Sequence, residues 1–394
     1  MGIRLAQQRR GLLGTGLLLA AIAGLLFWGS LYSAGQAQTS VPASNSAELI
    51  AALENMDAGD SITITLTAHE YFLDAIDNTT PSGNNGLPVI NGNVTIEGNG
   101  AVIRRSADST FRIFEVDSNR TLNLHEITIR GGGGVNVGGG IYVNNAGTLT
   151  LSSSTVRDNG AIESGGGIFN AGGTLTLINS TVSGNQANLI AGGGIVNSGG
   201  TLTLTSSTIS DNWAYTGGGI HNDGIATLTG TVVAGNQSIG DPDIAGDGSL
   251  SAASAYNFIG EDPQLGTLQH NGGPTETMMP QSASPLIDAI PLDSGNCATG
   301  ELEDQRGVSR PQGGGCDIGA LEVAPGLLYV DQSATDGVNN GTSWDNAFTD
   351  LQQALAEVSK RTVPIDIFVA GGTYYPTPEN APDRDASFVI PDGV

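Results

Sequence analysis

The sequence GGGIFNAGGTLTLINSTVSGN, residues Gly165–Asn185, decides the fold of this chain. It opens on three glycines, which in another context would form a phosphate-binding loop. Such a loop needs a strand before its glycines and a helix after them. Here the glycines lead to the alternating run Thr174–Leu177, TLTL, which has the period of a strand with one buried face. We therefore interpret the glycines as a sharp backbone corner with positive φ, where a Cβ would clash.

The same pattern recurs along the chain. Further triple glycines begin at Gly138, Gly192 and Gly217, so that successive copies start 25 to 27 residues apart. The leucines of the strand core follow the same period and reveal an earlier, degenerate copy, TLNLHEITIRGG, around Leu122. Repeats of this length at a fixed period indicate a stacked, solenoidal architecture.

Each repeat holds three short apolar pieces separated by Gly, Asn and Ser, as one coil of a parallel β-helix requires. Like residues of successive coils would lie about 4.8 Å apart. The expected fold class is therefore all-β, a parallel β-helix, and the strong bias of parallel crossovers makes it right-handed. Alternation places one set of side chains inside the coil, Ile168, Leu175, Leu177 and Val182, and another outside, Thr174, Thr176 and Thr181.

Two columns of asparagine accompany the repeat. One lies beside the glycine corner and the other at the end of the third strand. Side-chain amides can donate to one neighbour and accept from another, so we expect both columns to form hydrogen-bonded ladders along the axis. The first column consists of Asn170, Asn197 and Asn222, and the second of Asn159, Asn185, Asn212 and Asn236.

Charge and the N-terminal segment bear on location and partners. The 394 residues include 14 Lys+Arg and 39 Asp+Glu, a net charge of −25, which disfavours nucleic acid and anionic membranes as partners. Three arginines precede an apolar run from about residue 11 to 34, so residues 1–38 are predicted to be a signal peptide or an uncleaved signal anchor. Everything after this segment is expected to be exported, and membrane contact is expected only through it or through regions beyond the chain.

The rest of the chain divides into four segments. We expect an N-terminal cap with irregular first coils in 39–121 and regular repeats in 122–240. A capping segment, 241–323, is expected to fold over the last coil, because open ends of stacked coils must be protected. Residues 327–394 are predicted to start a second β-helix that is truncated, which suggests a fragment of a longer protein or an incomplete gene model. Cys297 and Cys316, the two cysteines, favour a disulfide in an exported chain.

The repeats and the capping segment resemble known families. The coils GGGIFN, GGGIVN and GGGIHN, each followed by an LTL-type strand, resemble the repeats of polymorphic outer membrane proteins. The segments NGGPTETMMPQSASPLIDAI and DQRGVSRPQGGGCDIGALE resemble the ending of the choice-of-anchor Q family. Together the resemblances cover about Leu122 to Glu322. They imply a right-handed, pectate-lyase-like β-helix at the cell surface, in the outer membrane or outside the cell, and no established chemistry.

Two pairs of residues are candidates for catalysis on a polysaccharide. Asp158 and Asp211 occupy equivalent positions two coils apart, about 9.6 Å by the rung spacing, at the edge of the range for an inverting glycosidase. Arg130 and Arg157, on adjacent coils, are the candidate bases of a polysaccharide lyase. Both aspartates precede an asparagine at a corner, where Asp is common for turn geometry alone. We favour structural roles for all four residues.

Metal binding rests on weaker signals. Asp241, Asp243 and Asp247 are the candidate ligands of a structural calcium ion, but their spacing lacks the terminal glutamate of an EF-hand loop. No other cofactor is expected.

The function expected from the sequence is a non-catalytic, exported β-helix scaffold of the bacterial cell surface. It would act as an adhesin-like or envelope-associated binding module, whose Thr and Asn ladders make repeated weak contacts with a carbohydrate or another surface protein. The alternative is a polysaccharide lyase or glycoside hydrolase acting along one flank of the β-helix.

Overall fold

The computed structural model describes residues 39–374 except 107, 282–283, 300–302, 324–325, 336–338, 340, 342–343, 345, 359–364, 373 and the side chains of a few further residues. The predicted signal segment, residues 1–38, lies outside the described residues. Within the described part of the chain, no helix is both long and apolar enough to cross a membrane.

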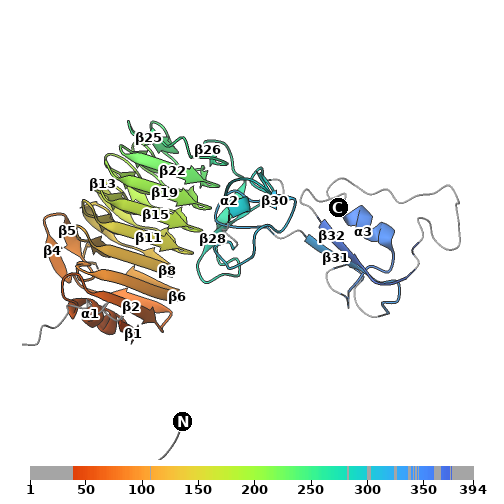
Figure 1. Ribbon diagram of the computed structural model, residues 1–394, viewed down its shortest axis with the longest axis horizontal. Coiled ribbons are helices and arrows are strands. Elements are labelled where there is room, and N and C mark those ends of the chain that lie inside the picture. Colours follow the sequence, from red (N-terminus) through yellow and green to blue (C-terminus); the bar gives the residue numbers. More distant parts are fainter. Residues whose placement is uncertain are drawn as a thin grey trace, which may run out of the picture. The chain divides into compact units, whose positions relative to one another are not determined.

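The repeats form a parallel β-solenoid of about 8 turns, which confirms the expected β-helix (Figure 1). A regular coil contributes three short strands, for example β14 (Ile168–Asn170), β15 (Thr174–Ile178) and β16 (Thr181–Ser183). Strands of successive coils pair in parallel and in register, so β15 lies between β11 (Thr148–Ser152) and β19 (Thr201–Thr205). The in-register pairing follows from the repeat, because equal spacing brings identical residues opposite one another.

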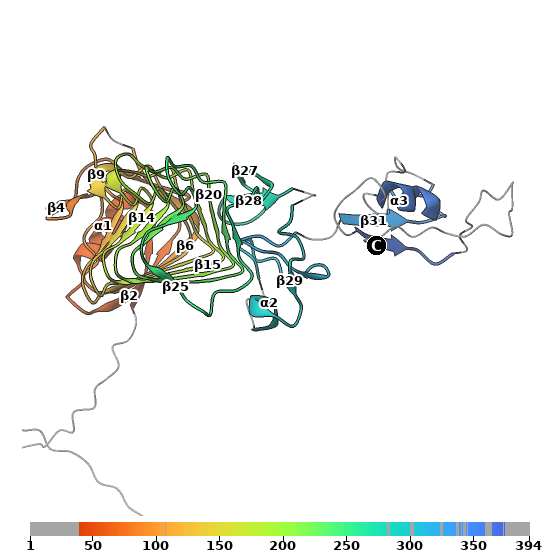
Figure 2. The same cartoon turned by 90° about the horizontal axis from the view of Figure 1, so that it is seen from above.

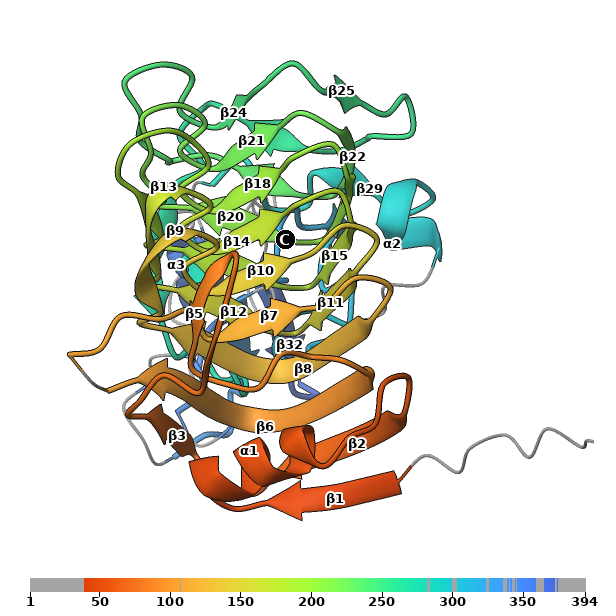
Figure 3. The ribbon, with the colours of Figure 1, turned by 90° about the vertical axis from the view of Figure 1, so that its left-hand side faces the viewer.

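Stacking these coils produces three flanks. The threonine flank contains β2 (Ser61–Leu66), β6 (Asn93–Arg105), β8 (Thr121–Arg130), β11, β15, β19, β22 (Ile225–Thr229) and β25 (Ser249–Leu250). The covered flank contains β3 (Glu70–Leu73), the second halves of β6 and β8, β12 (Thr155–Arg157), β16, β20 (Thr208–Ser210), β23 (Val232–Val233) and β26 (Phe258–Ile259). The glycine flank, which faces the viewer in Figure 3, contains β7 (Phe114–Val116), β10 (Ile141–Val143), β14, β18 (Ile195–Asn197), β21 (Ile220–Asn222) and β24 (Ile244–Ala245). A fourth, small sheet joins β9 (Gly133–Val137), β13 (Gly160–Ser164) and β17 (Gln186–Ala187).

The interior of the solenoid is a column of stacked aliphatic side chains. Leu149, Leu175 and Leu202 are register partners on adjacent coils, and all three are fully buried. Seen along the axis, the coils superpose on one another (Figure 2). Full burial of one such side chain contributes roughly 1.5–3 kcal/mol, so the stack compensates for the scarcity of large aromatic residues.

The N-terminal end of the solenoid is closed by a strand and a helix. β1 (Thr39–Ala43) pairs in parallel with β2, and α1 (Ser46–Glu54) buries Leu49 and Leu53 against the core. The side-chain oxygen of Asn45 accepts a hydrogen bond from the backbone N–H of Glu48 at 3.0 Å, which caps the helix. A short antiparallel hairpin, β4 (Asn78–Thr80) and β5 (Gly83–Asn85), projects from the next coil.

The segment after the last coil runs along the side of the solenoid. It contains the hairpin of β27 (Leu265–Gln269) and β28 (Thr277–Pro280), the pair β29 (Ile290–Pro291) and β30 (Gly315–Cys316), and helix α2 (Gly295–Thr299). Cys297 and Cys316 form the predicted disulfide. The hydrogen bonds of the segment lead to β12, β16 and β20, and Leu286, Ile290 and Ile318 pack with Val232 of β23. That the segment caps the last coil stays a prediction.

The reason for this placement is the hydroxyl column of the covered flank. Gln305 Nε2 donates to Thr155 Oγ1 at 2.9 Å, and Thr181 Oγ1 donates to Gln305 Oε1 at 2.7 Å. The backbone N–H of Ala320 donates to Thr208 Oγ1 at 3.0 Å. Thr181 thus points away from the core, as expected, but is completely buried beneath the chain's own C-terminal segment.

The last described elements repeat the plan of the N-terminal cap. β31 (Gly326–Val330) pairs in parallel with β32 (Ile365–Val369), and α3 (Leu351–Val358) lies between them in sequence. β1, α1 and β2 follow the same strand–helix–strand order. That these residues start a second β-helix stays a prediction.

Candidate functional site

The triple glycines form corners of the solenoid. The first glycine of the quoted repeat, Gly165, has φ +66°, and its equivalent Gly192 has φ +62°. A Cβ on Gly166 would come within 2.4 Å of the carbonyl oxygen of Gln186 on the next coil. The corner interpretation is therefore confirmed, because only glycine fits so close to a neighbouring backbone.

The two candidate catalytic aspartates also occupy a corner. Asp158 and Asp211 have φ +52° and +59°. The backbone N–H of Gly184, on the coil between them, donates to the carbonyl oxygen of Asp211. Equivalent corners elsewhere in the column carry glycine with positive φ, at Gly131, Gly184 and Gly235. Asp tolerates this left-handed conformation better than most residues, so the geometry accounts for both side chains. Partial burial raises the pKa of Asp211.

The candidate arginines lie on the covered flank. Residues 275–322, the covering segment, supply one of the partners of Arg157. Arg157 forms ion pairs with its neighbour Asp158 and with Glu276 of this segment, the latter at 2.5 Å. Its side chain is only 15% exposed. Arg130 lies in register between Arg104 and Arg157. The structure thus pairs Arg157 with Asp158. Arg157 is also paired with the chain's own Glu276, on a flank that residues 275–322 cover.

The asparagine columns form continuous ladders inside the coils. Asn170 Nδ2 donates to Asn197 Oδ1 at 2.8 Å, and Asn197 Nδ2 donates to Asn222 Oδ1 at 2.7 Å. The second column is linked in the same way, with 3.0 Å at each step, through Asn159, Asn185, Asn212 and Asn236. All seven side chains are buried, so these ladders hold the corners together and do not contact a partner.

Asp243, a candidate calcium ligand, closes the second ladder. Its Oδ1 accepts a hydrogen bond from Asn236 Nδ2 at 2.9 Å, and the residue is 6% exposed. Asp241 and Asp247 are exposed. Among the described residues, no group of three or more His, Cys, Asp or Glu side chains is arranged to hold a metal ion.

A buried ionic network stabilises the covering segment. Its residues lie in DQRGVSRPQGGGCDIGALE, which the sequence marked only by its resemblance to the choice-of-anchor Q family. Arg310 pairs with Glu322 at 3.0 Å with both side chains essentially inaccessible, and Arg306 pairs with Asp304 at 2.6 Å. Asp317 accepts backbone hydrogen bonds from Asp288 and Val323. Burial, together with the nearby charge of Glu322, raises the pKa of Asp317 to about 7.

The threonine flank is a regular surface that residues 275–322 leave open. In β11, β15, β19 and β22 the inward side chains are buried, whereas the outward ones are partly or fully exposed. These four strands carry no charged residue. Their outward residues form one row per strand, and successive rows stack in register from coil to coil: Thr148, Thr150 and Ser152; Thr174, Thr176 and Ile178; Thr201, Thr203 and Thr205; Ile225, Thr227 and Thr229.

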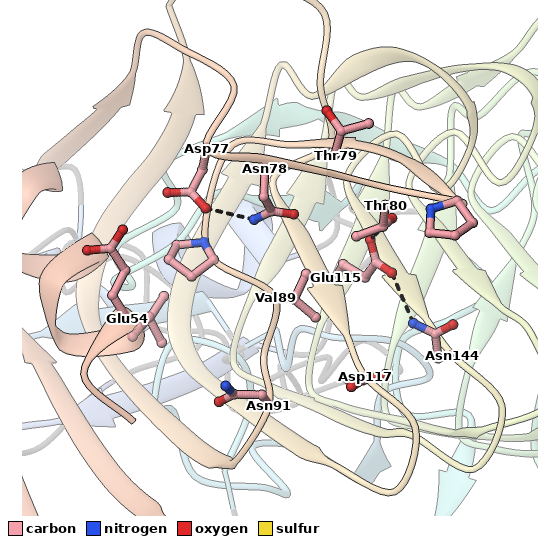
Figure 4. Close-up of a pocket in the computed structure, with 13 residues that line it drawn as sticks. Glu54, Asp77, Asn78, Thr79, Thr80, Val89, Asn91, Glu115, Asp117 and Asn144 are labelled. Atoms are coloured by element: carbon pink, nitrogen blue, oxygen red, sulfur yellow. Dashed lines mark hydrogen bonds between the residues drawn. The ribbon is translucent and has the colours of Figure 1, made fainter. Parts of the chain in front are cut away.

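A cavity of about 600 Å³ near the N-terminal end was not anticipated from the sequence (Figure 4). The β4–β5 hairpin, the end of α1, residues 88–91 and the turn after β7 surround it. Glu115 lies in its wall, 4% exposed, and accepts hydrogen bonds from Thr80 at 2.8 Å and from Asn144 at 3.1 Å. Behind it, Arg112 Nη1 lies 3.2 Å from Glu115 Oε2 and neutralises the buried charge. The contributing residues are far apart in sequence and, apart from Asn144, lie outside the regular repeats, so no motif marks them.

Comparison of the chain with protein-family models, with curated proteins and with solved structures found no match in any of the three.

Proposed function

We propose that the chain is an exported scaffold of the bacterial cell surface, a non-catalytic, adhesin-like or envelope-associated binding module. Its partner would be a neutral polysaccharide that runs along the threonine flank. The resemblance of the repeats to polymorphic outer membrane proteins, and of the ending to the choice-of-anchor Q family, supports the surface location.

The observation that carries the proposal is the contrast between two flanks. On β11, β15, β19 and β22 the threonine flank presents hydroxyl and methyl groups in uncharged rows about 4.8 Å apart, on a chain with a net charge of −25. Single hydroxyl contacts are weak, and repetition along a rigid surface adds them together. The flank that carries Arg157 and Asp158 is covered by residues 275–322, which argues against a catalytic groove there.

Co-sedimentation of the full chain with insoluble cellulose and chitin tests the binding proposal. We expect the protein to pellet with at least one of them. The double variant Thr176→Val and Thr203→Val removes two register-paired hydroxyls without changing side-chain shape, and should weaken binding about tenfold. Thr267→Val, in the exposed strand β27, is the matched control and should bind normally.

Two results would contradict this function. Absence of the protein from every pellet, or equal binding by the double variant, removes the threonine flank as the binding surface. Release of unsaturated products or new reducing ends from a panel of acidic and neutral polysaccharides, abolished by Arg157→Ala or Asp211→Ala, would instead establish the lyase or hydrolase alternative.

A further inference from the structure

We propose that the cavity between α1 and the β4–β5 hairpin is a binding site for a protonated amino sugar. This site is separate from the threonine flank, and the inference does not depend on what that flank binds. It rests on the cavity, on the charge of its rim and on the hydrogen-bonding state of its lining.

The size of the cavity fits a sugar. A volume of about 600 Å³ lies within the usual range for small-ligand pockets and exceeds the needs of a single ion. Figure 4 shows Glu54 and Asp77 on one side of the cavity and Asp117 on the opposite side. Acceptors that face each other across such a space suit a ligand with several polar groups around a ring.

The charge of the lining is uniformly negative. Four carboxylates line the cavity, and no Lys, Arg or His is among the lining residues. Arg112 compensates Glu115 from behind, so the uncompensated charge belongs to Glu54, Asp77 and Asp117, all of which are exposed. A ligand that carries an ammonium group is therefore attracted, and a uronic acid is repelled.

The hydrogen-bonding state of the lining selects a donor-rich ligand. Asn78 Nδ2 donates to Asp77 Oδ2 at 2.7 Å, and Thr79 Oγ1 donates to Asn84 Oδ1 at 2.9 Å. Thr80 Oγ1 and Asn144 Nδ2 are both engaged by Glu115. These donors are satisfied within the protein, whereas the Oδ1 atom of Asn91 is buried without a hydrogen-bond partner.

The remaining wall supplies apolar surface. Leu53, Pro81, Pro88 and Val89 line the cavity beside the acceptors. A sugar ring presents C–H groups on its faces and O–H or N–H₃⁺ groups at its edge, which matches such a mixed lining. A hydroxyl-rich ring that bears one ammonium group thus satisfies the size, charge and hydrogen bonding of the site together.

Isothermal titration calorimetry of the full chain at pH 6 with the fully deacetylated glucosamine trisaccharide tests the site. We expect saturable binding, and the N-acetylated trisaccharide, which has the same ring hydroxyls but no charge, should bind at least about tenfold more weakly. The double variant Asp77→Asn and Asp117→Asn keeps side-chain shape and should weaken binding of the deacetylated sugar by about tenfold or more.

The matched control removes the same charge elsewhere. Glu261→Gln with Asp262→Asn changes two exposed carboxylates that follow β26, and should leave the affinity unchanged. The assignment is overturned if the deacetylated sugar gives no binding, if both sugars bind equally, or if the cavity variant binds normally. It is also overturned if a trilysine peptide binds as tightly with the same sensitivity to the cavity variant, because the site would then recognise charge alone.

Discussion

Replacing one asparagine of the second ladder tests how the solenoid is held together. The side chain of Asn185 is buried and makes five hydrogen bonds: Oδ1 accepts from the N–H and the Nδ2 of Asn159, and Nδ2 donates to Val156 O, Ser183 O and Asn212 Oδ1. Asn185→Ala leaves the buried N–H of Asn159 without its hydrogen-bond acceptor. A buried polar group without a partner costs about 1–3 kcal/mol, so we expect a local destabilisation of that size.

Hydrogen exchange measured by mass spectrometry on peptides covering β16 and β20 checks this value. A loss of about 3 kcal/mol corresponds to exchange faster by roughly two orders of magnitude in those peptides. Asn188→Ala is the control, because Asn188 is exposed and only a few residues away. The reasoning fails if Asn185→Ala accelerates exchange no more than Asn188→Ala, since the ladder would then contribute nothing beyond an exposed asparagine.

Three further predictions concern the corner and the covering segment. Gly166→Ala would place a Cβ 2.4 Å from the oxygen of Gln186 and should lower the melting temperature by several degrees, whereas Gly314→Ala, with nothing within 4 Å, should not. Reduction of the Cys297–Cys316 bridge, 19 residues apart, should destabilise the covering segment by about 3 kcal/mol and expose it to limited proteolysis; unchanged protease resistance after reduction would contradict this. Because the folded-state pKa of Asp317 is raised to about 7, the contribution of this carboxyl to stability is full below pH 4 and is lost as the pH rises towards 7. Urea unfolding across this range should show a falling stability, by at most about 1.4 kcal/mol per pH unit for one group, and Asp317→Asn should flatten the slope; an unchanged slope in the variant would disprove the assignment.

The regular part of the fold was predictable because it depends on short-range repetition. The alternation in Thr174–Leu177 specifies a strand with one buried face, and the fixed period stacks each leucine on its equivalent in the next coil. The same period predicts which asparagines meet, because residues at equal positions in successive coils become neighbours. The disulfide followed from composition, since an exported chain with two cysteines favours pairing them.

The features that depend on tertiary structure alone, the covered flank and the cavity, arise from contacts that the repeat does not determine. The burial of Thr181 depends on Gln305, which is 124 residues away, and no local pattern connects the two. The same segment of the chain covers this flank and brings Glu276 to the candidate arginine Arg157. The cavity likewise depends on a hairpin, a helix end and two coils that meet only after folding. Periodicity determines contacts between equivalent positions, whereas contacts between unrelated segments depend on how the whole chain packs, and those contacts define the surfaces on which function is proposed here.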